Sequence, residues 1–120
     1  MLNIALMGAG RIGKMHAKNI ALHPMCNLSY VFDINKEFAN QVAQSTKAKV
    51  AKLPDEAIND NDVNVVFIAS ATPTHVDFIT KGAKAGKAIF CEKPIDLNIE
   101  KVDQCYETIK DCDVPIQIGF

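Results

Sequence analysis

The chain has 120 residues, of which 48% are hydrophobic and 22% charged, and its 13 Lys and Arg against 14 Asp and Glu give a net charge of −1. This length fits a single domain, and a balanced charge without a basic run argues against nucleic acid or an anionic membrane surface as a partner. The cysteines form no CxxC pair and no zinc-type spacing, so we expect no metal and the reduced thiols of a cytoplasmic protein.

Apolar segments alternate with helical patterns along the chain. Near-continuous apolar runs predict buried strands, whereas apolar spacings of three and four residues predict helices. We expect strands at 2–7, 28–32, 48–51, 63–69, 88–91 and 115–120, and helices at about 11–22 and 36–45. A third helix is expected to begin with Thr72 as its N-cap, followed by Pro73, and to end at Gly86. The last helix is expected to bury an apolar stripe of Ile99, Val102, Tyr106 and Ile109.

This alternation predicts an α/β fold, a Rossmann-type doubly wound parallel sheet that forms one dinucleotide-binding domain over residues 1–120. The last expected strand runs to the end of the chain at Phe120. We therefore expect the chain to be a fragment, truncated before a further domain.

The first expected strand is followed by Gly8-Ala9-Gly10-Arg11-Ile12-Gly13, which matches G-x-G-x-x-G and opens a helix. In this context the first glycine permits a tight turn, the second lets the backbone approach a pyrophosphate, and the third lets the helix pack closely. The free N–H groups and the helix dipole then favour an anion. A structural glycine turn without a ligand is the alternative.

Asp33 lies 20 residues beyond Gly13, where the second strand ends. A carboxylate there is placed to hydrogen-bond the ribose hydroxyls of the adenosine half and to repel a 2′-phosphate, and no cation follows before Lys36. We therefore expect NAD rather than NADP as the cofactor. The alternative is that Asp33 only caps the next helix.

Two further loops lie at the same edge of a parallel sheet. In the first, Ala69-Ser70-Ala71-Thr72-Pro73-Thr74-His75, small side chains let a cofactor lie against the backbone. His75 either faces the nicotinamide or bonds within its own N-cap region, whereas His16 and His23 read as structural or surface residues. In the second, Cys91-Glu92-Lys93-Pro94, Lys93 either has a functional role or forms a surface ion pair, which is worth only about 0–1 kcal/mol.

Together, the glycine turn, Asp33, Thr72-Pro73-Thr74-His75 and Glu92-Lys93-Pro94 resemble the nucleotide-binding half of the glucose–fructose oxidoreductase / inositol dehydrogenase / rhizopine catabolism (Gfo/Idh/MocA) family. The resemblance runs the length of the chain, and within the family it is strongest to myo-inositol 2-dehydrogenases. It implies an NAD-dependent dehydrogenase that oxidises a polyol or sugar hydroxyl by hydride transfer to the nicotinamide. It also implies an α+β substrate domain, absent here, that supplies the general base and the contacts of a homo-oligomer.

The resemblance assigns Lys93 as catalytic, because it hydrogen-bonds the reacting hydroxyl and stabilises alkoxide character. The expected cofactor-binding residues are Gly8, Gly10, Arg11, Ile12, Gly13, Asp33, Ala71, Thr72, Pro73, His75, Glu92 and Lys93. On this interpretation the isolated chain lacks activity. Two alternatives are a regulatory module that binds a dinucleotide without catalysis and a methyltransferase-like domain that reads a nucleoside at Asp33, which Gly13 disfavours.

Overall fold

Six parallel strands form one sheet in the order β3-β2-β1-β4-β5-β6 in the computed structural model, which describes residues 1–120. This order, which reverses between β1 and β4, is that of a Rossmann sheet and confirms the predicted fold class. All strands point the same way, so their carboxyl ends share one edge. The strands are β1 (Leu2–Met7), β2 (Cys26–Phe32), β3 (Lys49–Val50), β4 (Val65–Ile68), β5 (Ala88–Glu92) and β6 (Ile116–Gly119).

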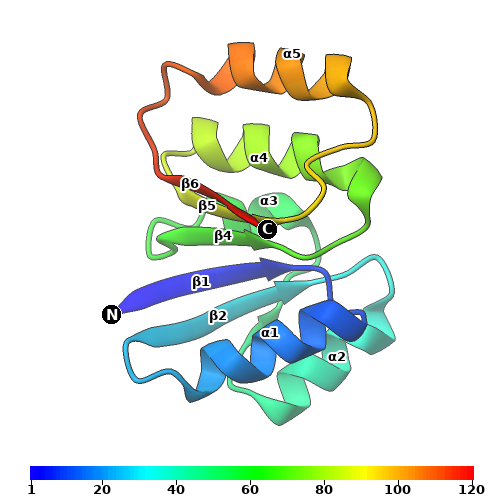
Figure 1. Ribbon diagram of the computed structural model, residues 1–120. Coiled ribbons are helices and arrows are strands. Elements are labelled where there is room, and N and C mark those ends of the chain that lie inside the picture. Colours follow the sequence, from blue (N-terminus) through cyan, green and yellow to red (C-terminus); the bar gives the residue numbers. More distant parts are fainter.

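Helices cover both faces of the sheet (Figure 1). One face carries α1 (Arg11–Leu22) and α2 (Lys36–Ser45), which pack on β1, β2 and β3. The other carries α3 (Pro54–Ile58), α4 (His75–Lys84), which packs on β4 and β5, and α5 (Ile99–Ile109), which packs on α4. No helix is both long and apolar enough to cross a membrane.

The double covering explains why β1 reads as a continuous apolar run. Ala5 and Met7 belong to the core beneath α3 and α4, whereas Ile4 and Leu6 belong to the core beneath α1 and α2. Successive strand residues point to opposite faces, so a strand covered on both sides needs apolar residues at every position. Each of the two cores therefore takes alternate residues of the same strand.

Two expectations about helix starts were incomplete. The short helix α3, which has Pro54 in its first turn, was not predicted. Thr72 was expected to be the N-cap of a helix, but the structure has a 3₁₀ turn at Thr72–Thr74 whose N-cap is Ala71, and α4 starts at His75. No side chain caps either start. Proline at the first turn was read correctly, because its fixed φ suits a 3₁₀ turn as well as an α-helix.

The stripe predicted for α5 was partly wrong. Ile99 and Tyr106 are 70% and 64% exposed, whereas Cys105 and Ile109 are buried. Both sets of residues have helical spacing, and they share Val102 and Ile109, so periodicity could not choose between them. The buried stripe instead takes Cys105, whose smaller side chain fits against the neighbouring helix at Thr80.

Candidate functional site

The glycine turn lies between β1 and α1 and is held closely by its neighbours. Gly8 has φ +104°, a left-handed conformation that favours glycine, and its N–H donates to Phe32 O at 2.8 Å. A Cβ on Gly13 would lie 2.0 Å from Gly8 O, closer than any side-chain atom can come. The tight turn expected of the first glycine and the close packing expected of the third are therefore both present.

Gly10 differs from these two glycines because a Cβ built on it meets nothing within 4 Å. It is the N-cap of α1, and no side chain bonds the amides of the first turn, which include those of Arg11 and Ile12. Uncapped amides and the positive end of the helix dipole attract an anion. The open side of Gly10 and these free amides thus fit a pyrophosphate that approaches the backbone.

Asp33 is fixed at the end of β2 by two backbone N–H groups. Its Oδ2 accepts from Ala9 N–H at 2.7 Å, and its Oδ1 accepts from Asn35 N–H at 2.8 Å. The cap of α2 is Asn35, whose side chain accepts from Glu37 and Phe38 N–H, so Asp33 is not the helix cap. A carboxylate has about four acceptor positions, which leaves room for two ribose hydroxyls.

A cavity of about 240 Å³ lies between these loops. Four of the predicted cofactor residues line it: Gly8, Gly10, Asp33 and Ala71. Three more lining residues, Ala69, Ser70 and Thr74, belong to the loop expected to lie against a cofactor. The sequence did not assign the remaining four to the site, namely Phe32, Ile34, Phe38 and Phe78. The cavity thus joins a carboxylate and a glycine turn to apolar walls, which suits a nucleoside with a flat base.

The loop after β4 places its predicted residues differently. Ala71 lines the cavity, whereas Thr72 and Pro73 belong to the adjoining 3₁₀ turn. His75 is 1% exposed, with Nδ1 2.7 Å from Pro94 O and Nε2 2.9 Å from Ser70 O. The Ser70 contact matches the interpretation that His75 bonds near its own N-cap, and direct contact with a cofactor would require the ring to leave both carbonyls.

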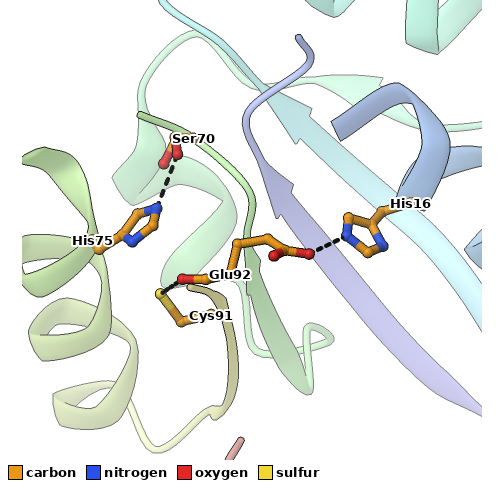
Figure 2. Close-up of polar contacts among 5 residues, drawn as sticks. All are labelled: His16, Ser70, His75, Cys91 and Glu92. Carbon is orange, nitrogen blue, oxygen red and sulfur yellow. Dashed lines mark hydrogen bonds and ion pairs between the residues drawn. The ribbon is translucent and has the colours of Figure 1, made fainter. Parts of the chain in front are cut away.

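Glu92 and Lys93 do not form the ion pair considered from the sequence. Glu92 Oε1 instead lies 2.6 Å from His16 Nε2 on α1. Figure 2 shows the two side chains pointing toward each other. Lys93 is exposed, and its ammonium makes no hydrogen bond or ion pair. The carboxylate therefore has a structural partner, while the lysine is free to meet a ligand at this edge of the sheet.

Cys91 precedes this pair but is not a candidate nucleophile. Its side chain is fully buried, and burial, with a smaller contribution from the Glu92 charge, raises the pKa of the thiol to about 12. A buried thiol with a raised pKa is almost entirely protonated at neutral pH and is unreactive. Cys91 is therefore excluded as a catalytic group, and Lys93 remains the candidate in this loop.

His16 was read from the sequence as a structural or surface residue, and its contact with Glu92 was not foreseen. Its partner lies 76 positions away in the chain, so no local pattern connects the two. Phe38 was also missed as a wall of the cavity, although its place in the first turn of α2, just after Asp33, was an available signal.

Comparison with known proteins agrees with this geometry. A family described as "Oxidoreductase family, NAD-binding Rossmann fold" (GFO_IDH_MocA) matches residues 2–120. An inositol 2-dehydrogenase of Rhizobium meliloti is 39% identical over 119 residues, which make up 99% of this chain and 36% of that protein. A scyllo-inositol 2-dehydrogenase (NAD(+)) of Bacillus subtilis is also 39% identical, over 97% of this chain and 34% of that protein.

Solved structures give the same result. A myo-inositol dehydrogenase from Corynebacterium glutamicum superposes with a TM-score of 0.93 at 43% identity, covering 99% of this chain and 36% of that one. A scyllo-inositol dehydrogenase from Lactobacillus casei with bound NAD(H) and scyllo-inositol has a TM-score of 0.89 at 28% identity, with the same coverage. The chain thus spans about a third of the length of these relatives. It belongs to the Gfo/Idh/MocA oxidoreductase family and forms that family's NAD-binding Rossmann domain.

Proposed function

We propose that this chain is the cofactor-binding part of a dehydrogenase that oxidises a ring or sugar hydroxyl of an inositol-like polyol. The observation that carries the proposal is the meeting of the glycine turn, Asp33 and Lys93 on three loops at one edge of the sheet. Relatives named inositol dehydrogenases support the substrate class, as does the Lactobacillus casei structure that holds scyllo-inositol together with NAD(H).

Each part of the cofactor has suitable residues in this chain. The amides of Arg11, Ile12 and Gly13 bind the pyrophosphate, and Asp33 accepts hydrogen bonds from the adenosine ribose while Ala71 lies along the wall. Bound NAD⁺ supplies the acceptor for a hydride. Thr72, Pro73 and Glu92 shape the two adjoining loops, and their contribution to binding goes through the backbone of those loops.

Lys93 acts on the substrate. Its free ammonium donates a hydrogen bond to the reacting hydroxyl oxygen and stabilises the negative charge that develops there as hydride leaves. The proton of that hydroxyl passes to a general base that these 120 residues do not supply. We therefore expect the isolated chain to bind the cofactor without turning over substrate.

The substrate pocket, the homo-oligomer and a cytoplasmic location belong to the same proposal. Their support is the family resemblance and the greater length of the relatives, of which this chain covers about a third. The residues that recognise the polyol and the surfaces that join subunits are expected in the part of such proteins that this chain does not match.

Titration calorimetry of the chain with NAD⁺ and with NADP⁺ tests the cofactor assignment. A 2′-phosphate about 4 Å from the Asp33 carboxylate would be repelled by roughly 1–4 kcal/mol. We expect NAD⁺ to bind more tightly by several-fold to several hundred-fold. Equal affinities would remove Asp33 from this role, and binding of neither nucleotide would overturn the proposed function.

A further inference from the structure

The residues on either side of Lys93 are each held by a histidine. Glu92 Oε1 lies 2.6 Å from His16 Nε2, and Pro94 O lies 2.7 Å from His75 Nδ1. His16 belongs to α1 and His75 to α4, which cover opposite faces of the sheet (Figures 1 and 2). The backbone at Lys93 is thus tied to both layers, while its side chain projects freely.

The contact between His16 and Glu92 differs from an ordinary surface ion pair. The two side chains are only 17% and 24% exposed. The His16 ring packs on Phe67 with centroids 4.6 Å apart, and Phe67 stacks on Phe90 at 4.3 Å. Packing against aromatic rings restricts the orientation of the imidazole, and hydrogen bonds to a charged acceptor are stronger than neutral ones. The direction of Nε2 toward Glu92 is therefore fixed by its surroundings.

Space beside Glu92 is also preserved from the far side. A Cβ on Gly119 in β6 would lie 2.8 Å from Phe90 Cζ and 3.5 Å from Glu92 Oε2. An added Cβ would press on the Phe90 ring, whereas its contact with the carboxylate would be an ordinary van der Waals one. Gly119 thus leaves room for the Phe90 ring beside Glu92.

His75 holds the other side of Lys93. Its buried ring lies between Pro94 O and Ser70 O, which joins the loop after β5 to the loop after β4. Carbonyl oxygens accept hydrogen bonds and do not donate them, and a neutral imidazole has one N–H, so the ring donates to one carbonyl at a time while it stays in contact with both loops. The position of Pro94 relative to the crevice therefore depends on His75.

We propose that His16 and His75 are positioning residues that set Lys93 against the nicotinamide end of the bound cofactor. The inference rests on the proposed function, because the cofactor and the reacting hydroxyl give Lys93 its role. Neither histidine touches the reacting atoms. Each acts through a neighbour of Lys93, His16 through the Glu92 side chain and His75 through the Pro94 carbonyl.

The test uses the chain labelled with ¹³C-lysine and ¹⁵N, titrated with NAD⁺ and followed by NMR. The Lys93 Cε signal is assigned from its loss in Lys93→Arg. His16→Phe keeps a ring against Phe67 but removes the donor to Glu92, and His16→Gln restores an N–H at a similar position. His23→Phe, at an exposed site after the same helix, is the matched control.

We expect NAD⁺ to shift the Lys93 signal and the Gly8 and Gly10 amides in the wild type and in His23→Phe. In His16→Phe the glycine amides should shift as before, while most of the Lys93 shift is lost; His16→Gln should regain part of it. A full Lys93 shift in His16→Phe would overturn the inference.

Other outcomes separate the inference from the proposed function. Glycine amides that do not respond to NAD⁺ in the wild type would refute cofactor binding itself. Glycine amides that respond without any shift at Lys93 would leave cofactor binding intact and overturn the positioning inference. If His16→Phe does not fold, Glu92→Gln decides, because it keeps an acceptor but removes the charge; an undiminished Lys93 shift in Glu92→Gln would overturn the inference.

Discussion

An added methyl group should have different effects at two glycines of the same turn: it should lower the stability at Gly13 and the NAD⁺ affinity at Gly10. In Gly13→Ala the new Cβ would lie 2.0 Å from Gly8 O and 2.6 Å from Gly8 C, and backbone atoms cannot rotate away. Overpacking of a core costs about 1–3 kcal/mol, and contact with backbone puts this case at about 3 kcal/mol. At about 4 °C per kcal/mol, Tm should fall by roughly 12 °C.

Gly10→Ala should leave stability almost unchanged. No atom lies within 4 Å of the new Cβ, and φ of −74° is accessible to alanine. The poorer N-cap costs less than about 1 kcal/mol. If a pyrophosphate approaches this backbone, however, the methyl group occupies its space. An overpacking cost of about 1–3 kcal/mol then weakens NAD⁺ binding by roughly 5- to 150-fold.

Thermal unfolding followed by circular dichroism and calorimetric titration with NAD⁺ measure the two effects on the same samples. A Gly13→Ala variant with the wild-type Tm would refute the packing reasoning. A Gly10→Ala variant that binds NAD⁺ as tightly as the wild type would place the pyrophosphate elsewhere.

Three further predictions concern single side chains. Asp33→Asn should narrow the ratio of NAD⁺ to NADP⁺ affinity measured by calorimetry, because the charge that repels a 2′-phosphate is lost; an unchanged ratio would exclude the carboxylate as its cause. In a protein extended to the length of the relatives, Lys93→Ala should lower kcat by about 10²–10³-fold, as loss of one oxyanion donor does, while its NAD⁺ affinity stays near that of the wild type. The control Lys101→Ala, at an exposed site, should keep the wild-type kcat. Unchanged turnover would overturn the assignment of Lys93 as catalytic. The pKa of Cys91, about 12 when folded, exceeds the ordinary thiol value of 9.0, so the folded chain keeps a proton that the unfolded chain releases. This contribution to the free energy of unfolding should therefore fall as pH rises from about 9 to about 12, and Cys91→Ala should flatten that fall in urea titrations; an equal slope in the variant would contradict the raised pKa.

The sheet and its edge were predictable from the sequence because the signals are local. A strand covered on both faces reads as an apolar run, as in β1, and a glycine turn followed by a helix reads as G-x-G-x-x-G. Alternation of these elements fixes parallel strands, and parallel strands bring their carboxyl ends together. The shared edge of Asp33, Ala71 and Lys93 therefore followed without knowledge of any contact.

Side-chain partners were not predictable in the same way. Glu92 has Lys93 as its neighbour in the chain, but successive residues at a strand end point in opposite directions. Glu92 points to the face of the sheet that carries α1, where His16 lies. The side chain of Glu92 therefore points away from that of its sequence neighbour Lys93. Pairing across 76 positions depends on how the His16 ring packs against Phe67 of β4 and Phe90 of β5, which periodicity does not specify.

The carboxylate beside the free lysine is therefore better understood as a means of fixing position than as a charge partner. A Glu92–Lys93 pair would have bound the ammonium and competed with a substrate hydroxyl for it. Because Glu92 hydrogen-bonds to His16, the carboxylate holds the loop in position, and the ammonium of Lys93 keeps its N–H donors free for a ligand. Stacked Phe67 and Phe90 keep that histidine in place, and Gly119 leaves room for the Phe90 ring. Residues on α1, β4, β5 and β6 thus all constrain a single loop of the crevice, which explains why a residue so exposed as Lys93 can still have a defined position.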